Sequence, residues 1–369
     1  MQAIKATRDA ILKPLQIVAG IIERRHTLPV LANVLITKKA ESIRFLGTDL
    51  EIQIQTAAQL GVGTDDIETT VSARKLIDIL KSLNEDAEVS IQIANKKATL
   101  QAGKSRFSLQ TLGAEDFPKV AINQTFAASF KLPQNQLKQL FHMVHFAMAQ
   151  QDIRYYLNGL LLVTDGDMVK VVATDGHRLA FCQRRIEGAS LAKQEVILPR
   201  KSVIELQRLL SDTEEPVSLD IAANQVRIRF ADVEMISKLV EGKFPDYQRV
   251  IPQGYTKHVV IDRTVLAAIL SRASILTNEK FKGIRLGVAP SVLKVQITNS
   301  DQEEGVDEVD VDYDGEALEI GFNVQYLQDV LANLKTDKVQ LSFGDANTSA
   351  LVTVPDDENF KYVVMPMRI

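Results

Sequence analysis

The sequence has little cysteine and no long apolar run. One cysteine among 369 residues excludes an internal disulfide and is typical of a reducing compartment. No run of about 18 apolar residues occurs, so we expect no membrane span and no membrane partner. The opening MQAIKATRDAILKPL is charged and lacks the apolar core of a signal peptide. We therefore expect a soluble cytoplasmic protein of bacterial or organellar type.

An excess of positive charge is also missing. The chain has 43 Lys and Arg against 47 Asp and Glu, which gives a net charge of −4. Proteins that coat nucleic acid with one large exposed basic face are usually basic overall, so this class is disfavoured. A basic surface among acidic ones stays compatible with the total. The hydrophobic fraction of 46% is ordinary for a globular protein, and the length predicts two or three domains.

Two stretches imitate ligand-binding loops, and each lacks a required residue. QAGKSRF (101–107) ends like a phosphate-binding loop, but Ala98 stands where the first glycine is needed. We expect a hairpin turn there instead. DVDYDG (310–315) resembles a calcium loop, but Gly321 stands at the glutamate position. Its alternating pattern predicts a strand with one acidic face over residues 309–314.

A histidine pair and a polar turn are the remaining chemical candidates. His142 and His145 have metal-ligand spacing on a helix, but no Cys, Asp or Glu completes a site, so we expect no metal. In TDGHRLA (174–180), Asp175 and His177 could form a general base and its orienting carboxylate. No nucleophile motif accompanies them, and the equivalent turns at 48 and 298 have no histidine. We expect instead a turn in which Thr174 and Asp175 bond the backbone.

The sequence repeats one plan three times. Amphipathic segments at 6–18, 132–144 and 261–273 start about 125 residues apart, and so does a second set at 72–83, 199–210 and 323–334. Alternating runs typical of strand, turn and strand lie between them. The chain is therefore predicted to be an α+β protein of three similar domains, residues 1–125, 126–255 and 256–369.

Seven stretches carry a family resemblance over the whole length. They are RHTLPVLANVL (25–35), RFSLQTLGAEDFP (106–118), QDIRYYLNGLL (151–161), TDGHRLA (174–180), SKLVEGKFPDYQRVIP (237–252), ILTNEKFKGIRL (275–286) and YVVMPMRI (362–369). In this order they closely resemble the bacterial sliding clamps, the beta subunits of DNA polymerase III. The resemblance implies the DNA clamp fold, in which each of three tandem domains has two helices packed on antiparallel sheets. It also implies a head-to-tail homodimeric ring of six domains.

The resemblance implies a processivity factor, a non-catalytic accessory subunit of the DNA polymerase III holoenzyme without cofactors. Such a ring encircles double-stranded DNA topologically and independently of sequence. It tethers the replicative polymerase alpha subunit, the clamp loader, other polymerases and repair proteins, which bind a hydrophobic groove through short peptide motifs. Two alternatives stay open at this point: a hydrolase that uses Asp175 and His177, and a DNA-independent protein scaffold.

DNA-contact candidates come from two loops and two helices. In QDIRYYLNG, tyrosines beside an arginine can stack on unpaired bases, while sheet packing is the alternative role for these tyrosines. Together with the resemblance, this gives the set Arg25, Arg74, Gln151, Arg154, Tyr155, Tyr156 and Lys201.

A head-to-tail dimer needs two unlike edges. A basic edge with apolar neighbours is expected to meet an acidic edge beside two apolar residues, because an apolar core with a charged rim is ordinary interface anatomy. The first edge is Lys104, Arg106, Phe107 and Leu109. The second is Ile275, Leu276, Glu303, Glu304 and Asp307.

The resemblance also implies the residues of the peptide groove, and the two methionines of the tail suit a surface that accepts different ligands. One side is Leu157, Thr174, Gly176, His177, Arg178, Leu179, Pro245, Arg249 and Val250. The other side is Phe281, Asn323, Tyr326, Val363, Val364, Met365, Pro366, Met367, Arg368 and Ile369.

Overall fold

The structure is a computed structural model that describes residues 2–23, 28–123, 125–278 and 282–369. The chain divides into two compact units. Unit 1 comprises Met1–Leu137 and Arg208–Leu239, and unit 2 comprises Lys138–Gln207 and Val240–Ile369. Within the described ranges no helix is long and apolar enough to cross a membrane.

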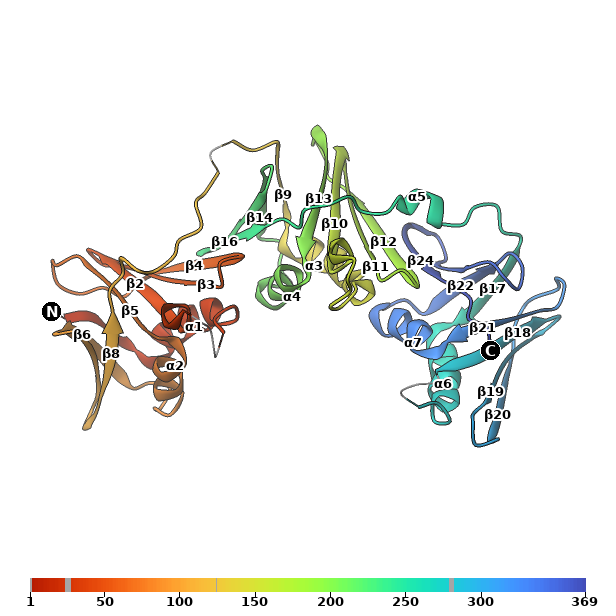
Figure 1. Cartoon of the computed structure of the whole chain (residues 1–369), viewed down its shortest axis with the longest axis horizontal. Helices are drawn as coiled ribbons and strands as arrows, with labels where there is room; N and C mark the ends of the chain where they lie inside the picture. The colour runs from red at the N-terminus through yellow and green to blue at the C-terminus, as the bar shows by residue number, and fades with distance from the viewer. Residues whose placement is uncertain (1, 24–27, 124, 279–281) are drawn as a thin grey trace. The chain divides into compact units, whose positions relative to one another are not determined.

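The element order repeats three times as strand, helix, four strands, helix and three strands (Figure 1). The first copy is β1 (Gln2–Thr7), α1 (Arg8–Ala19), β2 (Asn33–Lys39), β3 (Ser42–Thr48), β4 (Ile52–Gln59), β5 (Ile67–Ser72), α2 (Ala73–Lys81), β6 (Glu88–Ala94), β7 (Lys97–Ala102) and β8 (Ser105–Leu112). The second is β9 (Ala128–Pro133), α3 (Gln134–His142), β10 (Gly159–Gly166), β11 (Met168–Thr174), β12 (Arg178–Arg185), β13 (Leu191–Pro199), α4 (Arg200–Leu209), β14 (Pro216–Ile221), β15 (Gln225–Phe230) and β16 (Val233–Lys238). The third is β17 (Lys257–Asp262), α6 (Arg263–Ser274), β18 (Gly283–Ala289), β19 (Val292–Thr298), β20 (Glu304–Asp310), β21 (Leu318–Asn323), α7 (Val324–Asn333), β22 (Lys338–Phe343), β23 (Ala350–Val354) and β24 (Asp357–Val364). All six helices predicted from the repeats are confirmed.

Among the described residues, four short helical segments lie outside this repeat. They are η1 (Pro29–Ala32), η2 (His145–Ala147), η3 (Tyr155–Leu157) and α5 (Tyr247–Val250). Two of them, η3 and α5, carry residues of the candidate site described below.

The core of unit 1 lies between one sheet and two helices. The sheet has the order β1-β6-β7-β8-β5-β2-β3-β4-β16-β15-β14-β9. Helix α1 packs against β3, β4 and α2. Its buried residues Ile11, Leu15 and Val18 are three or four positions apart, so they share the face that meets the sheet.

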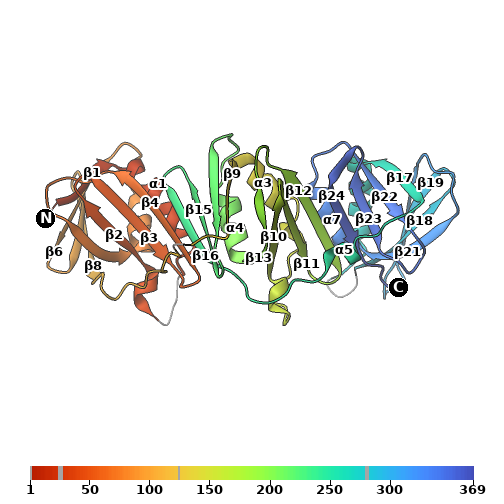
Figure 2. The same ribbon diagram turned by 90° about the horizontal axis from the view of Figure 1, so that it is seen from above.

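Unit 2 contains two sheets and the helix pair α6 and α7. The larger sheet has the order β13-β10-β11-β12-β24-β23-β22-β17, and the smaller one β20-β19-β18-β21 (Figure 2). Helices α6 and α7 lie side by side, and α6 packs against β19 and β20. The middle repeat is divided between the two units because the strands of its two halves belong to different sheets.

Two strand seams join equivalent edges of consecutive repeats. In unit 1, β4 pairs antiparallel with β16, and Ile52 faces Ser237. In unit 2, β12 pairs antiparallel with β24, and Arg178 faces Val364. In the third repeat, the strand equivalent to β4 and β12 is β20, and it is an outer strand of its sheet. The equivalent of β16 and β24 in the first repeat is β8.

Strand β8 has one edge that is largely uncovered. It pairs with β7 along its length, but with β5 only at Leu112 and Thr111. Within the described part of the chain, residues 105–110 have no strand neighbour on that second edge. The expected hairpin turn between β7 and β8 is confirmed, and Gly103 there has a φ of 55°.

One strand is shorter than the sequence predicts. The expectation of a strand over residues 309–314 is wrong, since β20 ends at Asp310. Val311 and Tyr313 are nevertheless buried, and their backbones exchange hydrogen bonds with Ser291. The alternating pattern there comes from two side chains that enter the core from a connecting segment.

Candidate functional site

The turn between β11 and β12 is held by its own side chains. The hydroxyl of Thr174 donates to the carbonyl of Arg178 at 2.6 Å and accepts from the amide of Gly176 at 3.1 Å. One oxygen of Asp175 accepts from the amides of His177 at 2.9 Å and Arg178 at 3.1 Å. The expected structural role of Thr174 and Asp175 is confirmed.

The same turn recurs in the first repeat. Thr48 donates to the carbonyl of Ile52, and Asp49 accepts from the amides of Glu51 and Ile52. Leu50 has a φ of 78° where Gly176 has 89°. The turn is therefore part of the repeated architecture.

Asp175 does not orient His177 as a catalytic base would require. Its second oxygen accepts from Nε of Arg178 at 3.1 Å. The ring of His177 instead stacks beside Tyr326, with ring centroids 6.3 Å apart. No group of three or more Cys, His, Asp or Glu that could hold a metal occurs among the described residues.

A cavity of about 200 Å³ opens beside this turn within unit 2. Its wall combines the turn, the end of β24, η3 and the segment leading into α5. The lining residues are Arg154, Tyr156, Leu157, Thr174, Gly176, His177, Arg178, Leu179, Pro245, Val250, Val363 and Met365. Ten of these twelve belong to the groove set expected from the sequence, and the other two were expected to contact DNA.

The cavity lies beside a hydrophobic cluster on the larger sheet of unit 2. Leu179 and Val363 belong both to the cavity wall and to this buried cluster. Phe244 and Tyr247 cover the cluster, and Tyr156 and Val250 pack against it. The floor of the cavity is thus apolar and fixed by the packing of a sheet, which suits a site for apolar side chains.

Arg154 forms part of the rim of the cavity. Its guanidinium makes two hydrogen bonds to Asp152, at 3.0 and 2.8 Å, and one to the carbonyl of Asp175 at 3.2 Å. Hydrogen bonds from Arg154 lower the pKa of Asp152 to about 2. A Cβ at Gly176 would lie 2.9 Å from this guanidinium, so any other residue there would displace Arg154 as well as adopt a φ of 89° that favours glycine.

The C-terminal tail is pinned at two points. The amide of Met365 donates to the carbonyl of His177 at 2.9 Å, and the amide of Met367 donates to the carbonyl of Gly321 at 2.7 Å. Only Met365 of the last five residues lines the cavity. Pro366, Met367, Arg368 and Ile369 continue past it.

The remaining groove candidates lie outside the cavity lining. Val364 is buried within β24. The side chain of Asn323 accepts from the amide of Gln325 and caps α7, and Tyr326 stands beside His177. Arg249 is exposed and pairs with Asp246 at 3.1 Å. Phe281 lies outside the described residues.

The DNA candidates occupy several environments. Tyr155 is 57% exposed, whereas Tyr156 packs against the hydrophobic cluster. Gln151 adopts a φ of 56° in the loop before η3. Arg74 and Lys201 lie on α2 and α4, and Arg74 has Asp78 at 3.5 Å. Arg25 lies outside the described residues.

The dimer candidates lie on the two open strand edges and beside them. Lys104 and Arg106 are exposed at the start of β8, and Phe107 and Leu109 are half-buried. Ile275 is 76% exposed just after α6, with Leu276 next to it. Glu303 and Glu304 are exposed at the start of β20, and Asp307 accepts from Nε of Arg272 at 2.6 Å.

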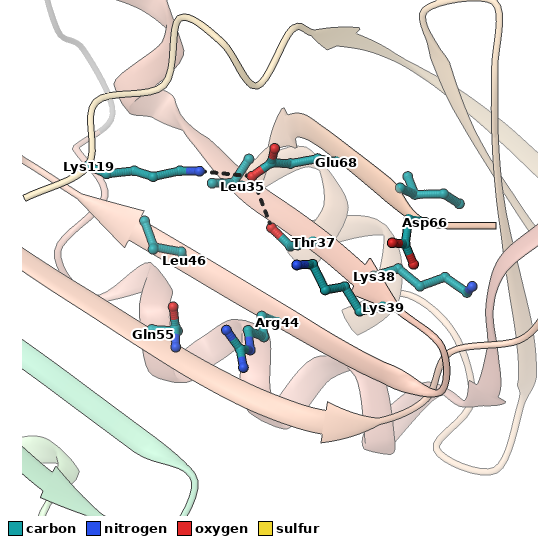
Figure 3. Close-up of a pocket in the computed structure, with 11 residues that line it drawn as sticks. Leu35, Thr37, Lys38, Lys39, Arg44, Leu46, Gln55, Asp66, Glu68 and Lys119 are labelled. Carbon is teal, nitrogen blue, oxygen red and sulfur yellow. Dashed lines mark hydrogen bonds and ion pairs between the residues drawn. The ribbon is translucent and has the colours of Figure 1, made fainter. Parts of the chain in front are cut away.

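A second depression, of about 420 Å³, lies on the sheet of unit 1 (Figure 3). Lys39, Arg44 and Lys119 line it together with Asp66 and Glu68, and Glu68 accepts from Lys119 at 2.9 Å. With Lys38, four basic side chains stand against two acidic ones, but none of the residues expected to be functional lies there. The cavity of unit 2 is therefore the better candidate site.

Comparisons with known proteins agree with the geometry. Family models of the DNA polymerase III beta subunit match residues 2–121 (N-terminal domain), 131–246 (central domain) and 248–368 (C-terminal domain). The beta sliding clamp of Pseudomonas putida is 47% identical over 362 residues, which cover 98% of each chain. That of Escherichia coli K12 is 43% identical over 362 residues, again 98% of each chain.

Solved structures are similar over the full length. A sliding clamp from Pseudomonas aeruginosa bound to griselimycin has a TM-score of 0.96 and 46% identity, with 100% of both chains covered. The polymerase III beta subunit of Caulobacter crescentus has a TM-score of 0.93 and 33% identity, also with 100% of both chains covered.

Proposed function

The chain belongs to the DNA polymerase III beta subunit family, and from this membership we propose that two copies close head to tail into a ring around duplex DNA. The ring is a processivity clamp. It does no chemistry and keeps a polymerase on its template. The observation that carries the proposal is the pair of open strand edges, β20 and β8, whose equivalents are already joined twice within the chain.

The register of the joint between copies follows from the two internal seams. The hairpins pair Thr48 with Gln53, Thr174 with Leu179, and Thr298 with Glu304, so Glu304 is the equivalent of Gln53 and Leu179. For the partner strands β16 and β8, Phe230 pairs with Val233 and Ala102 pairs with Ser105, each across a two-residue turn. Val233 and Ser105 are therefore equivalent, and the residues three positions later, Ile236 and Ser108, are equivalent too.

Gln53 faces Ile236 in the unit 1 seam. We therefore place Glu304 of one copy opposite Ser108 of the other. The same register sets Gly305 opposite Phe107, and Glu303 opposite Leu109.

This register explains the residues at both edges. Gly305 has no side chain and lies close against Leu276, so we propose that the ring of Phe107 from the other copy lies opposite this glycine and beside Leu276. On the opposite face, Arg106 lies diagonal to Glu304 and Glu308, within reach of long side chains. Opposite charges at such an edge fix register and orientation.

The cavity of unit 2 is proposed as the groove for partner peptides. Its apolar floor and few polar groups suit a short segment with apolar anchors, such as the polymerase alpha subunit, the clamp loader, other polymerases and repair proteins would present. The described groove candidates that do not line the cavity, Asn323, Tyr326 and the end of the tail among them, are proposed to extend it on one side, and Phe281, outside the described residues, is proposed as a further groove residue.

DNA is held loosely and without base readout in this proposal. Arg25, Arg74 and Lys201 contact phosphates, which gives an affinity that falls with salt and does not depend on sequence. Gln151 and Tyr155 stand in a loop suited to an unpaired base near a primer end. Arg154 and Tyr156 serve the groove rather than DNA.

We also propose that the chain has three domains, with limits near residues 125 and 255. Its proposed place is the cytoplasm, where the chromosome of a bacterium lies.

The test of this function is retention on DNA of different topology. A ring loaded on nicked circular DNA stays bound at high salt, because phosphate contacts are then screened and only topology holds it. Cutting the circle once releases it. A DNA-independent scaffold would not be retained on either form, and a hydrolase would lose its activity in His177→Ala. Equal retention on circular and on linear DNA would contradict the proposal that the protein is a clamp.

A further inference from the structure

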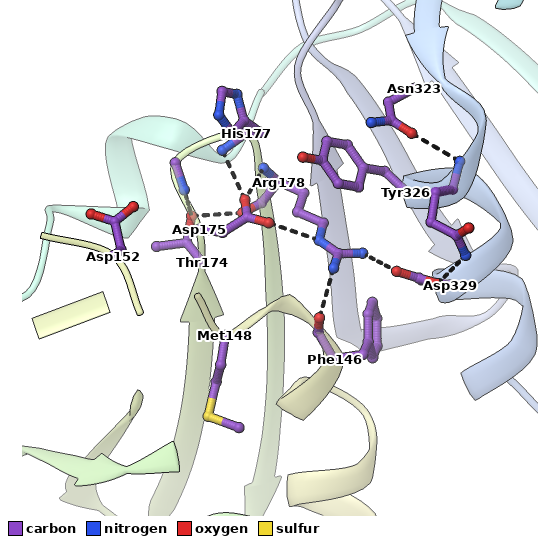
Figure 4. Close-up of polar contacts among 12 residues, drawn as sticks. Phe146, Met148, Asp152, Thr174, Asp175, His177, Arg178, Asn323, Tyr326 and Asp329 are labelled. Atoms are coloured by element: carbon purple, nitrogen blue, oxygen red, sulfur yellow. Dashed lines mark hydrogen bonds and ion pairs between the residues drawn. The ribbon is translucent and has the colours of Figure 1, made fainter. Parts of the chain in front are cut away.

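Each of the three guanidinium nitrogens of Arg178 donates a hydrogen bond within the protein (Figure 4). Its Nε donates to Asp175 at 3.1 Å, Nη1 to Asp329 on α7 at 2.5 Å, and Nη2 to the carbonyl of Phe146 at 2.8 Å. The side chain is only 10% exposed. The charge of Arg178 is therefore already paired with two carboxylates within the protein.

The guanidinium also stacks on an aromatic ring of α7. Its central carbon lies 4.6 Å from the ring centroid of Tyr326, which is the geometry of a cation–π contact. The carbonyl of Tyr326 accepts from the hydroxyl of the buried Tyr362 on β24 at 2.8 Å. Tyr326 is thus fixed from the strand side and from the arginine side.

Asp329 is the only carboxylate of α7 among these contacts, and it is itself held in place. Its second oxygen accepts from Nε2 of Gln325 at 2.8 Å. Burial opposes the charge of Arg178, but Tyr362, Asp329 and Asp175 outweigh it, so the pKa of Arg178 is raised. The cation is therefore held by charges on two different repeats.

We propose that Asp329, which does not line the cavity, is a positioning residue for partner-peptide binding. It holds Arg178 against Tyr326, and Tyr326 in turn holds the ring of His177 at the cavity rim. Without this carboxylate, the α7 side of the groove is free to move relative to the turn of β12. The inference rests on the proposed groove function.

The test measures the affinity of one peptide for the wild-type protein and for variants of its full length. The probe is a polymerase-derived peptide with an apolar C-terminal motif and a single tryptophan, whose fluorescence is unobscured because the chain contains no tryptophan. Asp329→Asn keeps the shape and removes the charge. We expect its Kd to rise about 3- to 30-fold, the range of coupling seen along packed networks. Asp312→Asn removes an exposed carboxylate of the same repeat and leaves the Kd unchanged.

A double-mutant cycle separates positioning from a general loss of stability. If Asp329 acts through Tyr326, the loss in Asp329→Asn largely disappears in a Tyr326→Ala background, whereas a general effect adds to it. Gln325→Leu is a milder second variant that can be used if Asp329→Asn folds poorly. It removes the bond from Gln325 to Asp329, and we expect a smaller loss of peptide affinity that also depends on Tyr326.

The outcomes distinguish this inference from the groove itself. A wild-type protein that does not bind the peptide would overturn the groove proposal. Wild-type binding with an unchanged Kd in Asp329→Asn, or strictly additive losses with Tyr326→Ala, would overturn the positioning role alone.

Discussion

Gly305 of β20 lies against Leu276: a Cβ built on Gly305 would come within 3.1 Å of Cδ1 of Leu276. A side chain at this position would therefore push against Leu276 and also against Ile297, whose Cγ2 would lie 3.1 Å from the same Cβ. In the proposed joint, Phe107 of the second copy lies opposite Gly305 and beside Leu276.

Gly305→Val should therefore separate the copies. The valine side chain would displace Leu276, which the proposed joint packs against Phe107, and well-packed central contacts carry most of the binding energy of an interface. Gly287→Val, in the same sheet, is the matched control, because a Cβ there meets only ordinary contacts at 3.9 Å. Sedimentation at micromolar concentration is expected to give monomers for Gly305→Val and dimers for Gly287→Val. Dimers of both would count against the joint.

Removal of the tail should weaken peptide binding strongly and leave the ring intact. Deleting Met365–Ile369 removes Met365 from the cavity wall and both backbone bonds that pin the tail. We expect at least about a tenfold weaker peptide Kd, since an apolar anchor and its wall are typical hot-spot contacts. Retention on nicked circular DNA, measured in parallel, should be unchanged. Normal peptide binding by the deletion would show that the groove lies elsewhere.

Lys38 should matter more than its neighbour Lys39. Its side chain is fully buried, and its ammonium donates to the carbonyls of Gly63 at 2.9 Å and Asp65 at 2.6 Å. Lys38→Met removes both bonds and should cost about 1–3 kcal/mol in the free energy of unfolding. Lys39→Met, at an exposed position, should cost less than about 0.5 kcal/mol. Hydrogen exchange should be faster at residues 61–66 only in Lys38→Met, and equal exchange in both variants would contradict this role.

Asp220 should stabilise unit 1 in a pH-dependent way. Burial opposes its charge, but bonds from Ser129 and Arg227 and the charge of Arg229 outweigh it and lower the pKa of Asp220. A carboxyl with a lowered native pKa stabilises the fold above its unfolded pKa of about 4, and this stability is lost as the pH falls through the native value. Asp220→Asn should therefore unfold more easily than wild type at pH 7, by about 1–3 kcal/mol.

The difference between Asp220→Asn and wild type should shrink below about pH 4, as the wild-type carboxyl takes up its proton. Denaturant titrations at pH 7, 4 and 3 measure it. A difference that does not change with pH would mean that the charge of Asp220 is not the cause.

The sequence predicts the helices and the threefold repeat well because both depend on local patterns. Apolar residues every three or four positions place the helices within one or two residues of their observed ends. The first helix starts two residues later than expected, at Arg8, because Ala6 and Thr7 pair with β6 instead. That pairing joins residues about 80 positions apart, and no local pattern reports it.

The candidate site could be predicted only in part for the same reason. Its residues came from a family resemblance, and the structure brings ten of them to one cavity. The sequence could not assign Arg154 to the cavity rim, because its contact with Gly176 depends on a turn 21 residues away. Nor could it predict Asp329, whose bond to Arg178 spans 151 residues.

The most direct test of the account is a disulfide between the copies in the proposed register. Directly opposite residues in antiparallel strands have Cβ atoms close enough for a disulfide, while residues displaced by two positions do not. The native Cys182 is buried, and burial raises the pKa of its thiol to about 12, so it does not compete. Glu304→Cys combined with Ser108→Cys should give a covalent dimer on oxidation, and Glu304→Cys combined with Gln110→Cys should not. A covalent dimer from the second combination only, or from neither, would contradict the proposed joint between β20 and β8.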